Sequence, residues 1–356
     1  MEALSSFKKN NHFFLFFLVF FPYITFGLFA SDTSPFYLVI IAFYVFIRSN
    51  YSRFGISKAL LFSVIIVLID TLVSSELGIL KFSATVIIAE ACFHLGRLSS
   101  HSFSYRYITA IAIVWSITGI ITLVSPELFS SLFYRVGADT DHTGAIRGAL
   151  GLTPEPSYYG MGSAFLYAFS MQTKINRTSN SKLDLPSLLF VISALLSLSL
   201  YGLAVLGVLA FKYNRFLSII SLIIGLILLT LIDTSFSRLT LLVVDAISSG
   251  GESLLDDSSI MYRVANFILI YQVLATNSYE INALTSGITI LFANFGTSAF
   301  ILVLLMFMLS SWSKTILRLS SNLFFLPLIL VMFFIGPLSN PFFWLYVGSA
   351  FKAKKL

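Results

Sequence analysis

Long apolar stretches separated by short polar connections dominate the pattern of hydrophobic and polar positions along this chain. A helix needs about 20 mostly apolar residues to cross the hydrocarbon core of a bilayer. The pattern predicts an all-α polytopic membrane protein with about twelve transmembrane helices. We expect these helices near residues 13–30, 36–47, 59–74, 79–95, 107–124, 158–173, 185–198, 200–211, 216–232, 284–309, 321–335 and 341–351.

The stretch 185–211 sets the orientation of everything after it. It can form one long helix or two short helices that turn near Tyr201 and Gly202. Cytoplasmic connections are enriched in lysine and arginine, and a single crossing would put Lys212 and Arg215 outside. We therefore expect two crossings and cytoplasmic termini, which place every basic residue inside except Lys81, Arg135, Arg147, Arg238 and Arg263.

Two outer connections are long, at about 125–157 and 233–283, and the others are short turns. Neither long loop has the length or apolar content of a separate soluble domain, so we expect one integral membrane domain over 1–356. In the second loop, 262–274 reads as an interfacial helix that follows the capping cluster 256–259. Function often resides on such loops.

The composition agrees with a lipid environment. Hydrophobic residues make up 57% of the 356 residues and charged residues only 11%, and the mean hydropathy is +0.92, far from the balance of a soluble domain. The formal net charge of +6 follows the cytoplasmic loops, so we expect no nucleic-acid partner. His142 lies near Asp139 and Asp141 without the spacing of a metal site, and we expect no metal.

The most informative segment for chemistry is 147–160, which ends the first long loop. Proline suits the first turn of a helix, so Pro156 should open the helix at 158–173 and put Glu155 at or beside its N-cap. The helix dipole favours a carboxylate there. Glu155 is then either a general base or a simple cap with Arg147 as its ion-pair partner.

Arginine is the second kind of residue that points to a site. A guanidinium binds two phosphate oxygens in a planar fork and keeps its charge in a dry environment. Arg147 and Arg263, one in each long loop, could converge on one pyrophosphate. Four further residues are candidates for binding substrate, namely Arg135, Arg238, Tyr158 and Tyr159. For the two arginines, the alternative is contact with solvent or lipid headgroups.

Three short blocks, in order along the chain, resemble those of a known family. They are Arg147 with the glycine-rich run that leads to Glu155-Pro156-Ser157-Tyr158-Tyr159-Gly160, then Leu198-Ser199-Leu200-Tyr201-Gly202, then Ser258-Ser259-Ile260-Met261-Tyr262-Arg263. With the plan of a dozen spans and two unequal outer loops, the chain resembles the Wzy-type polymerases of O-antigen and capsular polysaccharide repeat units, which are related to the O-antigen ligases.

The resemblance implies a GT-C-like glycosyltransferase of the bacterial inner membrane. Such an enzyme transfers an undecaprenyl diphosphate-linked glycan to a sugar hydroxyl of a lipid-linked repeat unit at the periplasmic face, with no metal and no cofactor. Carried over to this chain, it makes Glu155 the base and Arg147 and Arg263 the diphosphate-binding residues, and a direct displacement would invert the anomeric carbon. Expected partners are membrane lipids, a flippase and a chain-length regulator.

Two other functions stay open on the sequence. An O-antigen ligase would use the same donor with a lipid A-core acceptor, and we would expect a stronger outer-loop histidine in it. A transporter of lipid-linked glycans would use carboxylates within its spans, and Asp70 and Glu90 are the candidates. A transporter would also show symmetry between its halves, and no internal repeat is visible.

Overall fold

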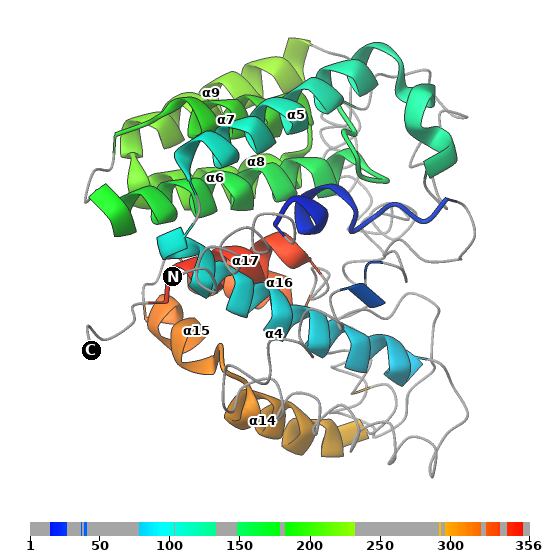
Figure 1. Ribbon diagram of the computed structural model, residues 1–356, viewed down its shortest axis with the longest axis vertical. Helices are drawn as coiled ribbons and strands as arrows, with labels where there is room; N and C mark the ends of the chain where they lie inside the picture. The colour runs from blue at the N-terminus through cyan, green and yellow to red at the C-terminus, as the bar shows by residue number, and fades with distance from the viewer. Residues whose placement is uncertain are drawn as a thin grey trace, which may run out of the picture. The chain divides into compact units, whose positions relative to one another are not determined.

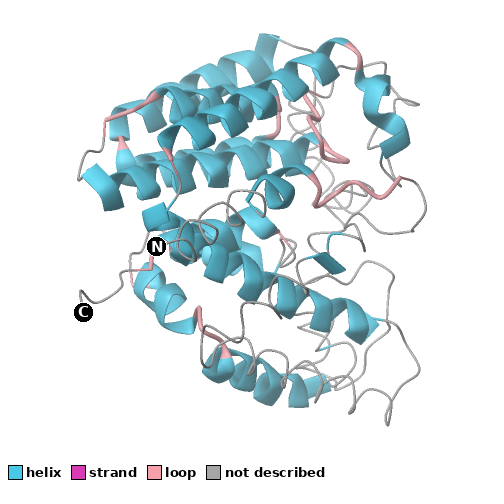
Figure 2. Cartoon of the chain, in the orientation of Figure 1, coloured by secondary structure: helices cyan, strands magenta, loops and turns pink. Residues whose placement is uncertain are grey.

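The computed structural model describes residues 15–26, 37, 39–40, 78–102, 104–132, 148–178, 182–231, 292, 296–321, 325–334 and 340–351. Helices are the only regular structure in these residues, and none of them lies in a strand (Figure 2). The all-α class expected from the sequence is thus confirmed for this part of the chain. The chain divides into two compact units. The first comprises Met1–Ile40, Cys92–Arg238 and Pro341–Leu356, and the second Ile41–Ala91 and Leu239–Asn340.

The first unit is a helical bundle (Figure 1). It contains the described candidate residues, which lie at the start of the helix expected over 158–173. In the bundle α6 packs against α7, α8 and α17, while α5 packs on α7 and α8 on α9. Its helices are α5 (Tyr105–Val124), α6 (Pro156–Thr178), α7 (Leu185–Leu196), α8 (Leu200–Tyr213), α9 (Arg215–Leu231) and α17 (Pro341–Ser349), with the 3-10 helix η1 (Pro126–Leu132) after α5.

Side-chain caps explain where several of these helices begin. Each cap is a small polar residue whose side-chain oxygen accepts a hydrogen bond from a backbone N–H of the first turn, as such residues do at helix starts. The caps are Ser104 for α5, Asp184 for α7, Ser199 for α8 and Asn214 for α9. Asn214 is also the single residue between α8 and α9, so the chain reverses sharply there.

The stretch 185–211 forms two helices that match the expected segments 185–198 and 200–211, but the residues that form the turn differ from the expectation. The break lies at Ser197–Ser199 and not at Tyr201–Gly202, which belong to the first turn of α8. Leu198 adopts a left-handed φ of 48°, and Ser199 caps α8 through Gly202 N at 3.3 Å. Capping serines, not the glycine, therefore set the turn.

The helix expected over 13–30 is shorter in the described residues. Residues 15–20 are helical, and the chain then turns through 21–26. Pro22 lacks a backbone N–H, and the N–H groups of Thr25 and Phe26 donate to the carbonyl of Leu132 at 2.8 and 2.9 Å. Hydrogen bonds to η1 thus replace those of a continuing helix.

Among the described helices, only α5 is long and apolar enough to cross a membrane by itself. Helices α14 (Ala299–Leu309) and α15 (Ser313–Ser320) meet at a short break with a bend of 101°. Together they are long and apolar enough for a second crossing if they form one span. Helix α4 (Gly78–Ser102) covers the expected segment near 79–95, and α16 (Leu326–Phe334) lies within the expected segment 321–335. Of the segment 284–309, the described residues include the 3-10 turn η2 (Gly296–Ser298) and helix α14. Twelve crossings stay a prediction, and 59–74 lies outside the described residues.

Candidate functional site

The structure describes three of the seven residues proposed from the sequence, namely Glu155, Tyr158 and Tyr159. All three lie at the start of α6. The four proposed arginines lie outside the described residues, namely Arg135, Arg147, Arg238 and Arg263. Asp70, His142 and the expected loop helix 262–274 also lie outside them. The described part of the candidate site therefore consists of Glu155 and its surroundings.

Glu155 holds the position that the sequence predicts for it. Pro156 is the first residue of α6, and the carbonyl of Glu155 accepts hydrogen bonds from the N–H groups of Tyr158 at 3.1 Å and Tyr159 at 3.2 Å. The side chain is half-buried, and Ser157 Oγ donates to its Oε2 at 3.1 Å. The helix is thus capped through the backbone of Glu155, while its carboxylate lies at the positive end of the helix dipole.

The turn before Glu155 is fixed by glycine and by a threonine of α5. Gly148 and Gly151 have φ of 95° and 57°, a left-handed conformation that favours glycine. A Cβ on Gly148 would overlap the carbonyl of Ser197. Thr122 Oγ1 accepts hydrogen bonds from Leu150 N at 3.1 Å and Gly151 N at 2.8 Å. The end of α5 therefore holds the turn that delivers Glu155.

Tyr159 packs α6 against α5. Its side chain is 0% exposed, its ring stacks on Trp115 with centroids 5.2 Å apart, and its hydroxyl donates to the carbonyl of Trp115 at 2.9 Å. Trp115 Nε1 in turn donates to Ser163 Oγ at 2.8 Å. A direct contact between Tyr159 and substrate would require these contacts to break, so its surroundings favour a packing role.

Tyr158 differs from its neighbour because it faces another direction on the helix. Its side chain is half-buried, and its ring lies 5.3 Å from that of Tyr23, centroid to centroid. Tyr23 comes from the turn that follows the first helical segment. Of the two tyrosines, Tyr158 is the one whose exposure suits contact with a substrate, and Tyr23 is a neighbour that the sequence pattern did not single out.

The start of α8 lies beside the start of α6. A Cβ on Gly202 would lie 2.7 Å from Gly160 Cα, so the backbones of the two helices touch within their first turns. Ala149 N, in the turn before Glu155, donates to Leu196 O at the end of α7 at 2.8 Å. We call this region, with the starts of α6 and α8 and the ends of α5 and α7, the Glu155 end. The positive starts of α6 and α8 thus lie beside the negative ends of α5 and α7.

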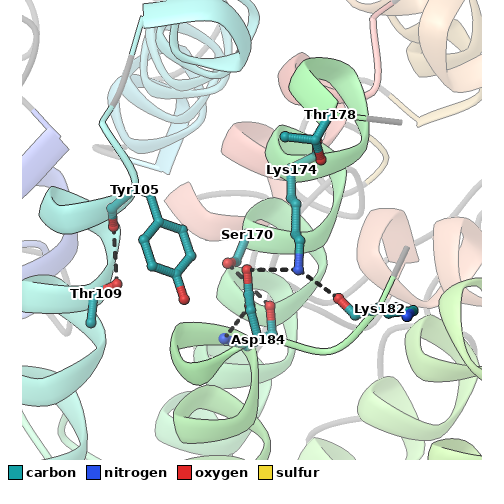
Figure 3. Close-up of polar contacts among 8 residues, drawn as sticks. Tyr105, Thr109, Ser170, Lys174, Thr178, Lys182 and Asp184 are labelled. Carbon is teal, nitrogen blue, oxygen red and sulfur yellow. Dashed lines mark hydrogen bonds and ion pairs between the residues drawn. The ribbon is translucent and has the colours of Figure 1, made fainter. Parts of the chain in front are cut away.

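The opposite end of the same bundle carries several of the basic residues that the structure describes. Tyr213 OH donates to Gln172 Oε1 at 3.0 Å, which places the ends of α8 and α6 together; we call this region the Lys212 end. In Figure 3 Lys174 points at Asp184, with Nζ and Oδ2 3.4 Å apart, and also donates to the carbonyl of Lys182 at 2.8 Å. The α6–α7 and α8–α9 connections, two of those that the charge pattern assigns to the inside, thus lie at one end of the bundle, away from Glu155.

Glu90, a candidate of the transporter alternative, lies in the second unit. It is 0% exposed, and its Oε1 accepts a hydrogen bond from Ser311 N at 2.8 Å. Ser311 belongs to the break between α14 and α15. A buried carboxylate at a broken helix is an arrangement found at ion and substrate sites of membrane proteins.

Within the described ranges, no group of three or more histidine, cysteine, aspartate or glutamate residues is placed to hold a metal ion. No protein family, curated protein or solved structure matches this chain.

Proposed function

We propose that this protein is a membrane-embedded polymerase of lipid-linked oligosaccharide repeat units. It transfers an undecaprenyl diphosphate-linked glycan to a sugar hydroxyl of a second lipid-linked repeat unit. The observation that carries the proposal is the Glu155 end, where the carboxylate of Glu155 stands at the start of α6 with the start of α8 beside it. This region thus offers a candidate base, and the binding of the leaving diphosphate is assigned to the loop arginines Arg147 and Arg263.

The reaction needs one base and one stabilised anion. The acceptor hydroxyl oxygen forms a bond to the anomeric carbon of the donor, and its proton passes to Glu155. The bond from that carbon to the diphosphate oxygen breaks, and undecaprenyl diphosphate leaves with the electron pair. Arg147 and Arg263 bind the charge that develops on it, an electrostatic effect that is strong where water is excluded. A single displacement from the opposite face inverts the anomeric centre.

The surface of the bundle supports a lipid environment. Exposed positions of α5 are occupied by large apolar side chains, among them Ile113, Val114, Ile117 and Ile120. In water this surface would be unfavourable, whereas lipid accepts it. We place the bundle in the inner membrane with the Glu155 end on the periplasmic side, and about twelve crossings belong to this proposal. The 23 residues of α6 extend about 34 Å, enough to reach from one surface to the other.

The direct test is synthesis of polymer by the purified protein in proteoliposomes supplied with one defined lipid-linked repeat. Wild-type protein should give a ladder of polymers, and Glu155→Gln should slow the reaction by about 100-fold or more, the usual effect of losing a general base. The capping hydrogen bonds use the backbone carbonyl of Glu155, so the glutamine variant should fold normally.

Ser157→Ala is the matched control for that experiment. It removes the hydroxyl that donates to Glu155 Oε2 and keeps the carboxylate, so it should retain most of the activity. If Glu155→Gln makes polymer as fast as wild type, Glu155 is only a cap and the proposed mechanism is wrong.

A second candidate function, transport of lipid-linked glycans, is favoured by the single observation at Glu90. Its buried carboxylate meets the break between α14 and α15. The two functions differ in what Glu90→Gln should do in proteoliposomes. A transporter would lose movement of the lipid-linked repeat between leaflets, whereas the polymerase would keep the reaction when substrate is present on both sides.

A further inference from the structure

The corner between α8 and α9 presents two cations that are held in place by aromatic rings. Lys212 Nζ lies 5.0 Å from the ring centroid of Tyr213 and 5.4 Å from that of Tyr346, and it donates to Tyr346 OH at 3.0 Å. Arg215 Cζ lies 5.3 Å from the ring centroid of Phe211. Both cationic side chains are exposed. Their charges therefore face the surroundings from defined positions, since rings attract cations to their faces.

An apolar face begins directly beyond these cations. Phe216 is 72% exposed, and Ile219, Ile223 and Ile227 follow along the same helix at 55%, 51% and 49%. The intervals of three and four residues put these side chains on one stripe of α9. The stripe starts next to Arg215 and runs away from it, so charge and apolar surface are continuous.

We infer that this corner binds an anionic phospholipid, with its phosphate against Arg215 and Lys212 and an acyl chain along the stripe of α9. A nucleic acid or an acidic peptide would match the cations and leave the apolar stripe uncovered. A phospholipid of net negative charge matches both, and basic residues between helices are known to bind such headgroups. The inference rests on the Lys212 end alone and does not depend on the proposed polymerase activity.

The test is native mass spectrometry of the delipidated full-length protein in a neutral detergent, titrated with phosphatidylglycerol. The reference ligand is phosphatidylcholine with the same acyl chains. Phosphatidylglycerol should bind more tightly, and Arg215→Gln should weaken it by about fivefold, the contribution of one basic residue near an anionic headgroup. Arg215→Lys keeps the charge and should restore most of the binding.

Arg106→Gln is the matched control. Arg106 is an exposed basic residue in the first turn of α5, which packs on α7, and its loss changes the net charge equally. It should leave the affinity for phosphatidylglycerol unchanged. Thermal unfolding of each variant in the same detergent separates loss of binding from loss of fold.

Four results would overturn the inference. Equal affinity for the two lipids would show that charge is not recognised, and an equal loss in Arg106→Gln would show a diffuse positive surface instead of a site. Competition by glycerol 3-phosphate at the affinity of the whole lipid would show that the α9 stripe contributes nothing. An Arg215→Gln protein that stays folded and binds phosphatidylglycerol like wild type would refute it as well.

Discussion

Alanine at Gly202 should force α8 away from α6 at the Glu155 end. A Cβ at this position would lie 2.7 Å from Gly160 Cα, 2.9 Å from Gly160 C and 3.2 Å from Met161 N. These are backbone atoms of α6, so no side-chain rotation can relieve the overlap. The two helices must separate, and the start of α6 that carries Glu155 must move with them.

The expected cost follows from two opposing effects. Alanine is favoured over glycine inside a helix by about 1 kcal/mol, whereas overpacking typically costs about 1–3 kcal/mol, and occasionally more. At Gly207, also in α8, the nearest atom to an added Cβ is Leu222 Cδ2 at 3.0 Å, the end of a flexible side chain. Gly207→Ala should therefore be neutral or stabilising. The helix-propensity gain is common to both variants, so Gly202→Ala should be less stable than Gly207→Ala by the overpacking cost of about 1–3 kcal/mol.

Both variants can be compared by unfolding the purified protein in mixed micelles with increasing SDS and following tryptophan fluorescence. Trp115 packs beside α6 at the site, so its environment should report the separation. Gly202→Ala should also lose polymerase activity before it loses its fold, because Glu155 is displaced. Equal free energies of unfolding for the two variants would refute the backbone contact between α6 and α8.

Further predictions concern the turn before the site, the orientation of the bundle and the arginines. Thr122→Val should lower the free energy of unfolding by about 2 kcal/mol or more, because two buried N–H groups of 150–151 lose their acceptor; unchanged stability in the SDS assay would contradict this role. Reporter fusions after Ser131 and Arg177 should report the outer compartment and the cytoplasm, and a shared location would exclude the proposed orientation. Arg147→Lys should lose most polymer synthesis in proteoliposomes, although the charge is kept, because an ammonium lacks the planar fork of a guanidinium. Normal synthesis by this variant would exclude bidentate binding of the diphosphate.

Local chemistry made the start of α6 predictable. Proline at the first helical position and a polar residue before it are signals that act within a few residues, and the structure places Pro156 and Glu155 accordingly. The charge pattern likewise separated 185–211 into two helices. The segment bounds 185–198 and 200–211 agree with the observed break, but the assignment of the turn to Tyr201 and Gly202 was wrong, because Ser199 caps α8 and both residues lie in its first turn.

Contacts between distant segments were not predictable in the same way. Tyr158 and Tyr159 are identical neighbours in sequence, and only the packing of Trp115 on one of them shows which is buried. Thr122 gave no signal because its partners lie in a loop far along the chain. The proposed roles of Arg147 and the other loop arginines stay predictions, since they lie outside the described residues.

The proposed polymerase function is tested most directly in cells whose only copy of the protein carries Glu155→Gln. The measurement is which leaflet of the membrane holds the lipid-linked repeat. The repeat is detected on intact spheroplasts with an impermeant sugar-modifying enzyme, with lysed spheroplasts as the control for total repeat. A polymerase blocked after export should leave single repeats on the periplasmic side, where the enzyme modifies them without lysis. Single repeats that become accessible only after lysis would contradict the account and assign the protein to transport.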